Sequence, residues 1–258
     1  MKRTQRVVSA LAWGLALGGA VLVAARAAPF GPTTRPTGPA TRPGTQPARV
    51  IFQDLFTEGV APSPDRWLVR NPDRQRVAVR QGMLVAHAEA KDRPTRVEFQ
   101  AQEALPSLGK WTLEFDAVVT SLWGGGRGEV RVELRDFATR ADREGTDFVL
   151  AERYWNEQSG LKFGLFHGGA FVGWHEVAPV GQLGAWHHYR VEYDAGNLTL
   201  WRDNERTLEC DVASMLDRPL TEGVSVEMGF HVPAACGIEG CLDNVTITSP
   251  EPTPRPKP

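Results

Sequence analysis

Between residues 50 and 248 the chain alternates between hydrophobic and polar positions with a period of two. The clearest segments are 111–119, 129–135, 187–193 and 224–231. A period of two puts alternate side chains on opposite faces of a β-strand, so each segment predicts a strand with one buried face.

Shorter segments with the same enrichment in hydrophobic, β-branched and aromatic residues predict further strands: 51–56, 79–88, 146–155, 161–166, 171–177, 198–202 and 242–248. Turns rich in Gly, Asn and Asp separate them, and only 212–217 suggests a helical turn. Ten or more antiparallel strands in about 200 residues predict an all-β, antiparallel β-sandwich jelly roll.

The N-terminal residues 1–28 have the pattern of a secretory signal peptide. Basic residues precede an apolar stretch at 7–25, and Ala25-Arg26-Ala27 fits a cleavage site. This predicts export to the periplasm, the cell surface or the extracellular space. The alternative is an uncleaved anchor that contacts a membrane through 7–25, because these nineteen residues approach spanning length.

Proline-rich segments flank the predicted domain. Residues 29–49, rich in Pro, Thr and Arg, predict an extended linker, and residues 249–258 predict a Pro-rich tail. One folded domain, 50–248, remains between them. It holds 20 basic and 30 acidic residues, a net charge of −10, without a basic stripe. Nucleic acid is therefore a poor partner.

Three cysteines are present, and export would permit a disulfide bond. Cys236 and Cys241 flank a short loop with two glycines, which favours a Cys236–Cys241 pair. A Cys210–Cys241 bridge is the alternative, and the sequence alone does not decide between them.

The order of these segments resembles the concanavalin A-like lectin/glucanase superfamily, especially laminin-G-like jelly rolls. The resemblance rests on Phe52–Phe56, Gln81–Val85, Trp186–Tyr193, Leu198–Asn204 and Leu242–Ile247. It covers nearly all of the domain and implies the fold. It leaves the function open, because the superfamily contains lectins, hydrolases, lyases and adhesion modules. Hydrolases of 3-keto-disaccharides also share such a fold, but their site residues have no match here.

One strand carries a candidate catalytic motif. Gly128-Glu129-Val130-Arg131-Val132-Glu133 resembles the Glu-x-Asp-x-Glu strand of laminarinase-type glycoside hydrolases. That resemblance implies Glu129 as nucleophile and Glu133 as acid/base. Here Arg131 replaces the central Asp. A cation between two carboxylates stabilises their charged forms, whereas a general acid must carry a proton. The pattern therefore favours a salt-bridged ladder, or Arg131 as a donor to sugar hydroxyls, over catalysis.

Aromatic side chains beside turns are candidates for stacking on sugar rings. They are Trp123, Tyr154, Trp155 and Trp174. Arg131 and Glu192 are the candidate hydrogen-bonding partners in the same ligand site. The other candidate role for these aromatic residues is edge packing. By contrast, Trp67, Trp111 and Trp186 occupy positions where the superfamily usually packs its core, so we expect structural roles for them.

The superfamily resemblance also implies a structural calcium ion where the first and last strands meet, with Asp54 and Asp243 as ligands; alternatively, Asp243-Asn244 forms a turn. The leading functional hypothesis is an exported, non-catalytic module that binds a polysaccharide or oligosaccharide. The alternatives are a glycoside hydrolase that uses Glu129 and Glu133, and a protein-binding, laminin-G-like adhesion module.

Overall fold

The computed structural model describes the residues 48–57, 59–70, 75–102, 110–136, 146–155, 158–167, 170–176, 181–211 and 224–250. All of them belong to one compact unit, Thr33–Pro258. The described part of the chain contains no helix that is long and apolar enough to cross a membrane. The predicted signal peptide or anchor, nearly all of the linker and tail, and the helical turn at 212–217 lie outside the described residues.

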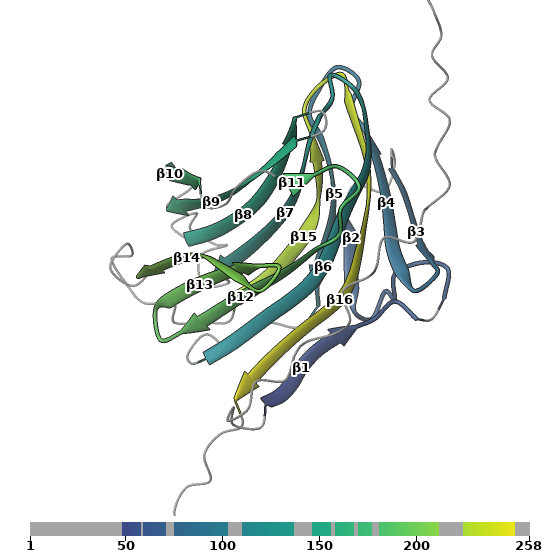
Figure 1. Cartoon of the computed structure of the whole chain (residues 1–258). Coiled ribbons are helices and arrows are strands. Elements are labelled where there is room, and N and C mark those ends of the chain that lie inside the picture. The colour runs from purple at the N-terminus through teal and green to yellow at the C-terminus, as the bar shows by residue number, and fades with distance from the viewer. Residues whose placement is uncertain are drawn as a thin grey trace, which may run out of the picture. The chain divides into compact units, whose positions relative to one another are not determined.

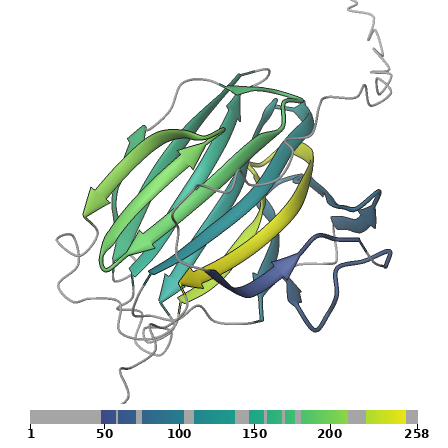
Figure 2. The ribbon, with the colours of Figure 1, turned by 60° about the horizontal axis from the view of Figure 1, so that its bottom comes forward.

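Two antiparallel eight-stranded sheets stack on one another (Figures 1 and 2). The first, which we call sheet A, contains β14 (Glu205–Asp211), β13 (Asn197–Arg202), β12 (His187–Asp194), β6 (Lys110–Gly124), β16 (Cys236–Pro250), β4 (Met83–Glu89) and β3 (Gln75–Arg80) in spatial order, with β1 (Ala48–Asp54) paired to β16. Sheet B contains β10 (Ala170–Glu176), β9 (Gln158–His167), β8 (Thr146–Trp155), β7 (Arg127–Asp136), β15 (Val224–Val232), β5 (Thr95–Ala101) and β2 (Trp67–Arg70), with β11 (Gly181–Gln182) paired to β9.

Alternation along the strands builds the core between the sheets. In β6 the side chains of Leu113, Phe115 and Ala117 point inward and are at most 1 % exposed. In β7, Val130 and Val132 point inward from the other layer. Burial of such apolar surface is the main favourable term in folding. The predicted all-β, antiparallel β-sandwich is therefore confirmed.

The tryptophans predicted to have structural roles are all buried or partly buried. Trp67 and Trp111 are each 2 % exposed within the core, and Trp186 is partly buried. The Trp111 ring stacks on Tyr193 with 5.4 Å between centroids. Aromatic pairs of this kind add to the burial of the rings themselves.

The segment predicted as one strand at 79–88 is instead the hairpin of β3 and β4. Gln81 and Gly82 form the turn, with φ angles of 53° and 72°. Two consecutive positive φ angles fit a type I′ turn, which matches the twist of a two-residue hairpin. Strand pairing also extends past the predicted domain boundaries, because Ala48 pairs with Pro250.

The predicted Cys236–Cys241 disulfide is wrong, because both residues are buried free thiols in the single strand β16. Five residues of strand span about 17 Å, whereas a disulfide needs α-carbons within about 7 Å. Burial, with Glu239 and Asp243 nearby, raises the pKa of the Cys241 thiol to about 12. The alternative partner Cys210 lies in β14, four positions from β16 in sheet A, or about 19 Å.

A buried polar network joins the two sheets beneath β8. Glu152 of sheet B is 1 % exposed and points into the core. It accepts a hydrogen bond from the Tyr189 hydroxyl and a second, of 3.2 Å, from Nη1 of Arg202. His187 lies 4.0 Å from the same carboxylate. Because Tyr189 and Arg202 belong to sheet A, this network fixes the position of β8 across the sandwich.

A second polar cluster lies on the outward face of sheet A. Nδ1 of His188 contacts Asp116 at 2.7 Å, and Nε2 lies 3.8 Å from Glu114. Asn244 donates a 2.6 Å hydrogen bond to the other oxygen of Asp116. The hydrogen bonds to Asp116 and Glu114 outweigh burial and raise the pKa of His188 from 6.5 to about 9.

This shift predicts a pH-dependent stability. A raised folded-state pKa contributes stability that is fully present below the unfolded value and is lost as pH rises through the folded value. We expect the melting temperature of the wild-type protein to fall between pH 6.5 and 9 relative to that of His188→Gln. Thermal denaturation of both proteins from pH 6 to 10 would measure this. Parallel curves would contradict the prediction.

Candidate functional site

The candidate site is built on β7, in the middle of sheet B. Because Val130 and Val132 face the core, the alternating Glu129, Arg131 and Glu133 face outward. Nε of Arg131 lies 2.5 Å from Glu133, and Nη1 lies 3.5 Å from Glu129. The structure thus confirms the salt-bridged ladder predicted from the sequence.

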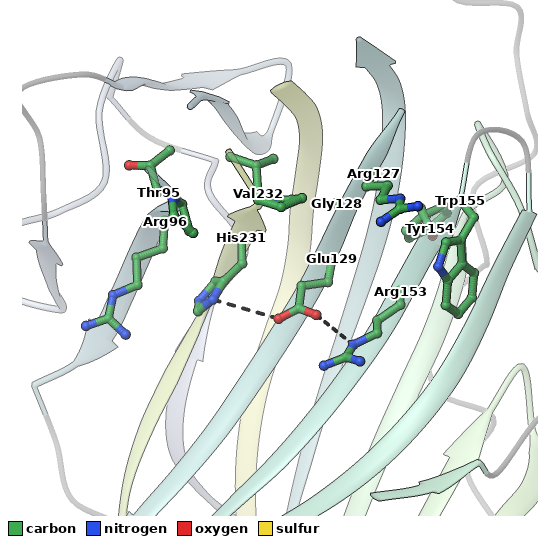
Figure 3. Close-up of a pocket in the computed structure, with 12 residues that line it drawn as sticks. Thr95, Arg96, Arg127, Gly128, Glu129, Arg153, Tyr154, Trp155, His231 and Val232 are labelled. Atoms are coloured by element: carbon green, nitrogen blue, oxygen red, sulfur yellow. Dashed lines mark hydrogen bonds and ion pairs between the residues drawn. The ribbon is translucent and has the colours of Figure 1, made fainter. Parts of the chain in front are cut away.

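Strand register extends this ladder sideways. Glu129 is directly opposite Arg153 of β8 and His231 of β15, and His231 is opposite Arg96 of β5. Residues paired in this way point to the same side of a sheet. Nε of Arg153 donates a 2.9 Å bond to Glu129, and Nδ1 of His231 lies 3.8 Å from the same carboxylate. Figure 3 shows Glu129 between these two partners.

The outward-facing carboxylates nearer the sheet centre are more deeply buried. Glu98, opposite Gly229, and Glu133 are 2 % and 4 % exposed, and Glu227, directly opposite Glu133, is 1 % exposed. Arginine side chains pair with them: Arg70 lies 3.3 Å from Glu227, and Glu133 is paired with Arg131 of the ladder. Buried carboxylates require such partners.

Three of these residues are close enough to one another to be considered as metal ligands. Among the described residues, Glu98, Glu133 and His231 each offer a ligand atom within 4.8 Å of the other two. However, Arg96 approaches Glu98 at 3.1 Å and Arg131 approaches Glu133 at 2.5 Å. Guanidinium groups already hold these carboxylates, so we assign the three residues to the ion-pair network.

A cavity of about 730 Å³ opens above the row formed by Arg153, Glu129, His231 and Arg96. Its charged or titratable lining and its one exposed aromatic ring belong to Arg96, Arg127, Glu129, Arg153, His231 and Trp155, and the buried Tyr154 also borders it. We call it the sheet B cavity. Arg127 and Trp155 are paired across β7 and β8 and lie side by side in Figure 3. Trp155 is 41 % exposed, which is unusual for so large an apolar side chain.

Of the aromatic residues predicted to stack on sugar, Trp155 lies in the cavity. Tyr154 does not present its ring there, because its side chain is 2 % exposed and packs in the core. Neighbouring residues of a strand face opposite sides, so these two cannot serve the same surface. Trp174 lies in β10, opposite Gly164 of β9; its side chain is outside the described part.

The prediction that Trp123 and Glu192 belong to the same ligand site as Trp155 is wrong, because both residues lie on the outward face of sheet A. Trp123 covers Gly237, where any Cβ would fall within 1.8 Å of the indole ring, and it stacks on His87 at 4.8 Å. Glu192 accepts a 3.2 Å hydrogen bond from the indole of Trp201. The sandwich separates both residues from the sheet B cavity.

The two aspartates predicted to bind calcium do not fit a shared site. Asp54 faces the core side of β1, where its oxygens accept 2.8 Å bonds from the Phe56 amide and the Trp67 indole. Asp243 is directly opposite Asp116 and faces the other side of sheet A. The backbone N–H of Asn244 donates a 2.7 Å bond to Asp243, but both residues lie at a β-bulge within the strand β16, so the alternative prediction of a turn is wrong. Calcium binding by the chain stays a prediction.

Sequence reasoning missed the four other charged or titratable residues of the cavity: Arg96, Arg127, Arg153 and His231. Arg127 and Arg153 were within reach of the sequence, because each shares a strand face with a predicted site residue, Glu129 and Trp155 respectively. Arg96 and His231 depend on the pairing of β15 with β7 and β5, which alternation does not reveal.

No protein-family model matches the chain, and no curated protein is significantly similar to it in sequence. Solved structures do match its fold. The GlcNAcα1-4Gal-releasing endo-β-galactosidase of Clostridium perfringens has a TM-score of 0.62 and 11 % identity over 84 % of this chain, which spans 66 % of that protein.

This chain covers almost the whole length of two further matching structures. An endo-acting O-glycanase that initiates mucin breakdown in members of the human gut microbiota has a TM-score of 0.60 and 16 % identity, over 78 % of this chain and 99 % of its own. The catalytic domain of a laminarinase from Thermotoga petrophila has a TM-score of 0.58 and 12 % identity, over 81 % of this chain and 100 % of its own. At these identities the likeness establishes the jelly-roll fold.

Proposed function

We propose that the protein binds a saccharide chain in the sheet B cavity. One observation carries this proposal: the exposed ring of Trp155 stands beside Arg127, Glu129 and Arg153 in a cavity of about 730 Å³. An aromatic face suits the apolar C–H surface of a sugar ring, and charged groups around it suit the hydroxyls. The volume lies within the range usual for ligand sites.

Removal of the aromatic platform tests the proposal. We expect Trp155→Ala to weaken retardation by a bound polysaccharide in affinity electrophoresis by about three- to tenfold, because stacking contributes that much beyond burial. Trp201→Ala is the matched control, since this partly exposed tryptophan lies on the outward face of sheet A, stacked under Arg190 at 4.4 Å. Uniform mobility across neutral and charged polysaccharides would instead favour the laminin-G-like, protein-binding alternative.

Hydrolysis of the bound chain is the second candidate function. The fold neighbours are glycosidases, which supports this candidate better than a purely non-catalytic module. Glu129 and Glu133 also share one strand face, and Glu129 opens into the cavity. Both carboxylates converge on the guanidinium of Arg131, although their α-carbons lie about 13 Å apart along the strand. A retaining pair requires a separation of about 5–5.5 Å between carboxyl groups.

Arg131 is the feature that opposes hydrolysis. A guanidinium 2.5 Å from Glu133 stabilises the carboxylate, whereas the acid/base of a retaining enzyme must deliver a proton. The retained polymer should therefore be incubated with the protein and assayed for new reducing ends. Release that disappears in both Glu129→Gln and Glu133→Gln, and rises in Arg131→Asp, would establish hydrolysis. Binding without release would leave the non-catalytic function.

A further inference from the structure

The charge of the sheet B cavity differs from that of the domain around it. Three arginines, Arg96, Arg127 and Arg153, line the cavity, and Glu129 is its one lining carboxylate. Counted over its arginine and glutamate side chains, the lining carries a formal net charge of +2, whereas the domain as a whole carries −10. A local excess of positive charge in an acidic domain points to a ligand that supplies negative charge.

Arg127 shows this excess most clearly. Its side chain is exposed, and it forms no ion pair with any residue that the structure describes. Its neighbour across the strand pair is Trp155, so guanidinium and indole stand together at one end of the cavity (Figure 3). Glu129 is engaged by Arg153 at 2.9 Å and by Arg131 at 3.5 Å, and therefore leaves the charge of Arg127 uncompensated.

We infer that the saccharide bound in the sheet B cavity carries an acidic substituent, a carboxylate or a sulfate ester, that pairs with Arg127 while the sugar ring stacks on Trp155. The inference rests on the proposed saccharide binding. The planar guanidinium fork matches the paired oxygens of both anions, which a lysine would bind only as a point charge. Arg96, 45 % exposed at the far side of His231, is already paired with Glu98 at 3.1 Å, so Arg127 is the cation that the inference uses.

Matched pairs of polymers test this inference in affinity electrophoresis. One pair is polygalacturonate and its methyl-esterified form, and the other is a sulfated galactan and its desulfated form. We expect retardation by the acidic member of one pair, and a loss of at least tenfold in affinity for its neutral counterpart. The pair that responds identifies the acidic group as carboxylate or sulfate.

Arg127→Gln should weaken binding of that acidic polymer by about ten- to a hundredfold, the range for a lost hydrogen bond to a charged group, and should reduce the dependence on salt. Arg206→Gln is the control, because this arginine is 58 % exposed on β14 of sheet A and should leave binding unchanged. An equal loss in both variants would indicate general charge attraction and overturn the site.

The remaining outcomes separate the two proposals. Equal binding of acidic and neutral members, weakened by Trp155→Ala but unchanged by Arg127→Gln, would overturn the inference while supporting saccharide binding. The absence of retardation by every polymer would overturn the proposed function and the inference together.

Discussion

Replacement of Gly229 by alanine is expected to lower the free energy of unfolding by about 3 kcal/mol, near the upper end for overpacking. A Cβ at this position would lie 1.9 Å from the carbonyl oxygen of Val97 and 3.1 Å from the α-carbon of Glu98. Both obstacles are backbone atoms of β5, which cannot rotate away. The neighbouring strands β15 and β5 of sheet B would have to separate. In thermal denaturation, a melting temperature roughly 6–12 °C lower is expected for a domain of this size.

Gly128→Ala is the matched control for this prediction. Gly128 also lies in sheet B, and its Cβ would meet Ile238 at 2.8 Å and Leu122 at 3.1 Å. These are ends of flexible side chains that can move by a few tenths of an ångström. We therefore expect a cost of roughly 1 kcal/mol. Equal destabilisation by the two substitutions would show that close backbone approach is not the reason for glycine at 229.

Alternation in the sequence was sufficient to predict the sandwich, because burial of one strand face is a local property. The segment 129–133 illustrates this: its valines face the core and its charged residues face outward, as predicted. Alternation does not say which strands become neighbours. Glu129 meets Arg153 and His231 through register between strands that are far apart in sequence, so the cavity was not predictable from periodicity.

The misplaced aromatic residues have two different physical explanations. Tyr154 and Trp155 are consecutive in β8, so the period of two already excludes a shared surface, and that signal was present in the sequence. The prediction that Trp123 belongs to the ligand site failed for a non-local reason. It packs across Gly237, a residue of β16 that lacks a side chain, and only the pairing of β6 with β16 brings the two together.

Breaking the buried ion pair between Glu152 of sheet B and Arg202 of sheet A is the other change expected to have a large effect on the free energy of unfolding. Replacement of Arg202 by methionine should cost about 3–5 kcal/mol, because it removes the cation that compensates a carboxylate buried in the core. Glu152 is 1 % exposed and Arg202 is 8 % exposed. The hydroxyl of Tyr189 would still donate to Glu152, but a neutral donor does not replace a guanidinium at 3.2 Å. Urea denaturation would measure the loss.

The double variant Glu152→Leu/Arg202→Met distinguishes the net contribution of the ion pair to stability from the cost of removing only one of its partners. Exchange of both charged groups for apolar ones removes the uncompensated charge, so we expect stability to recover to within about 1–2 kcal/mol of the wild type. Simple addition of the two single losses would contradict that expectation. Because Glu152 directly precedes Arg153 on β8 and anchors that strand to the core, the single Arg202→Met variant should also weaken saccharide binding at Arg153 and Trp155, and the double variant should restore it.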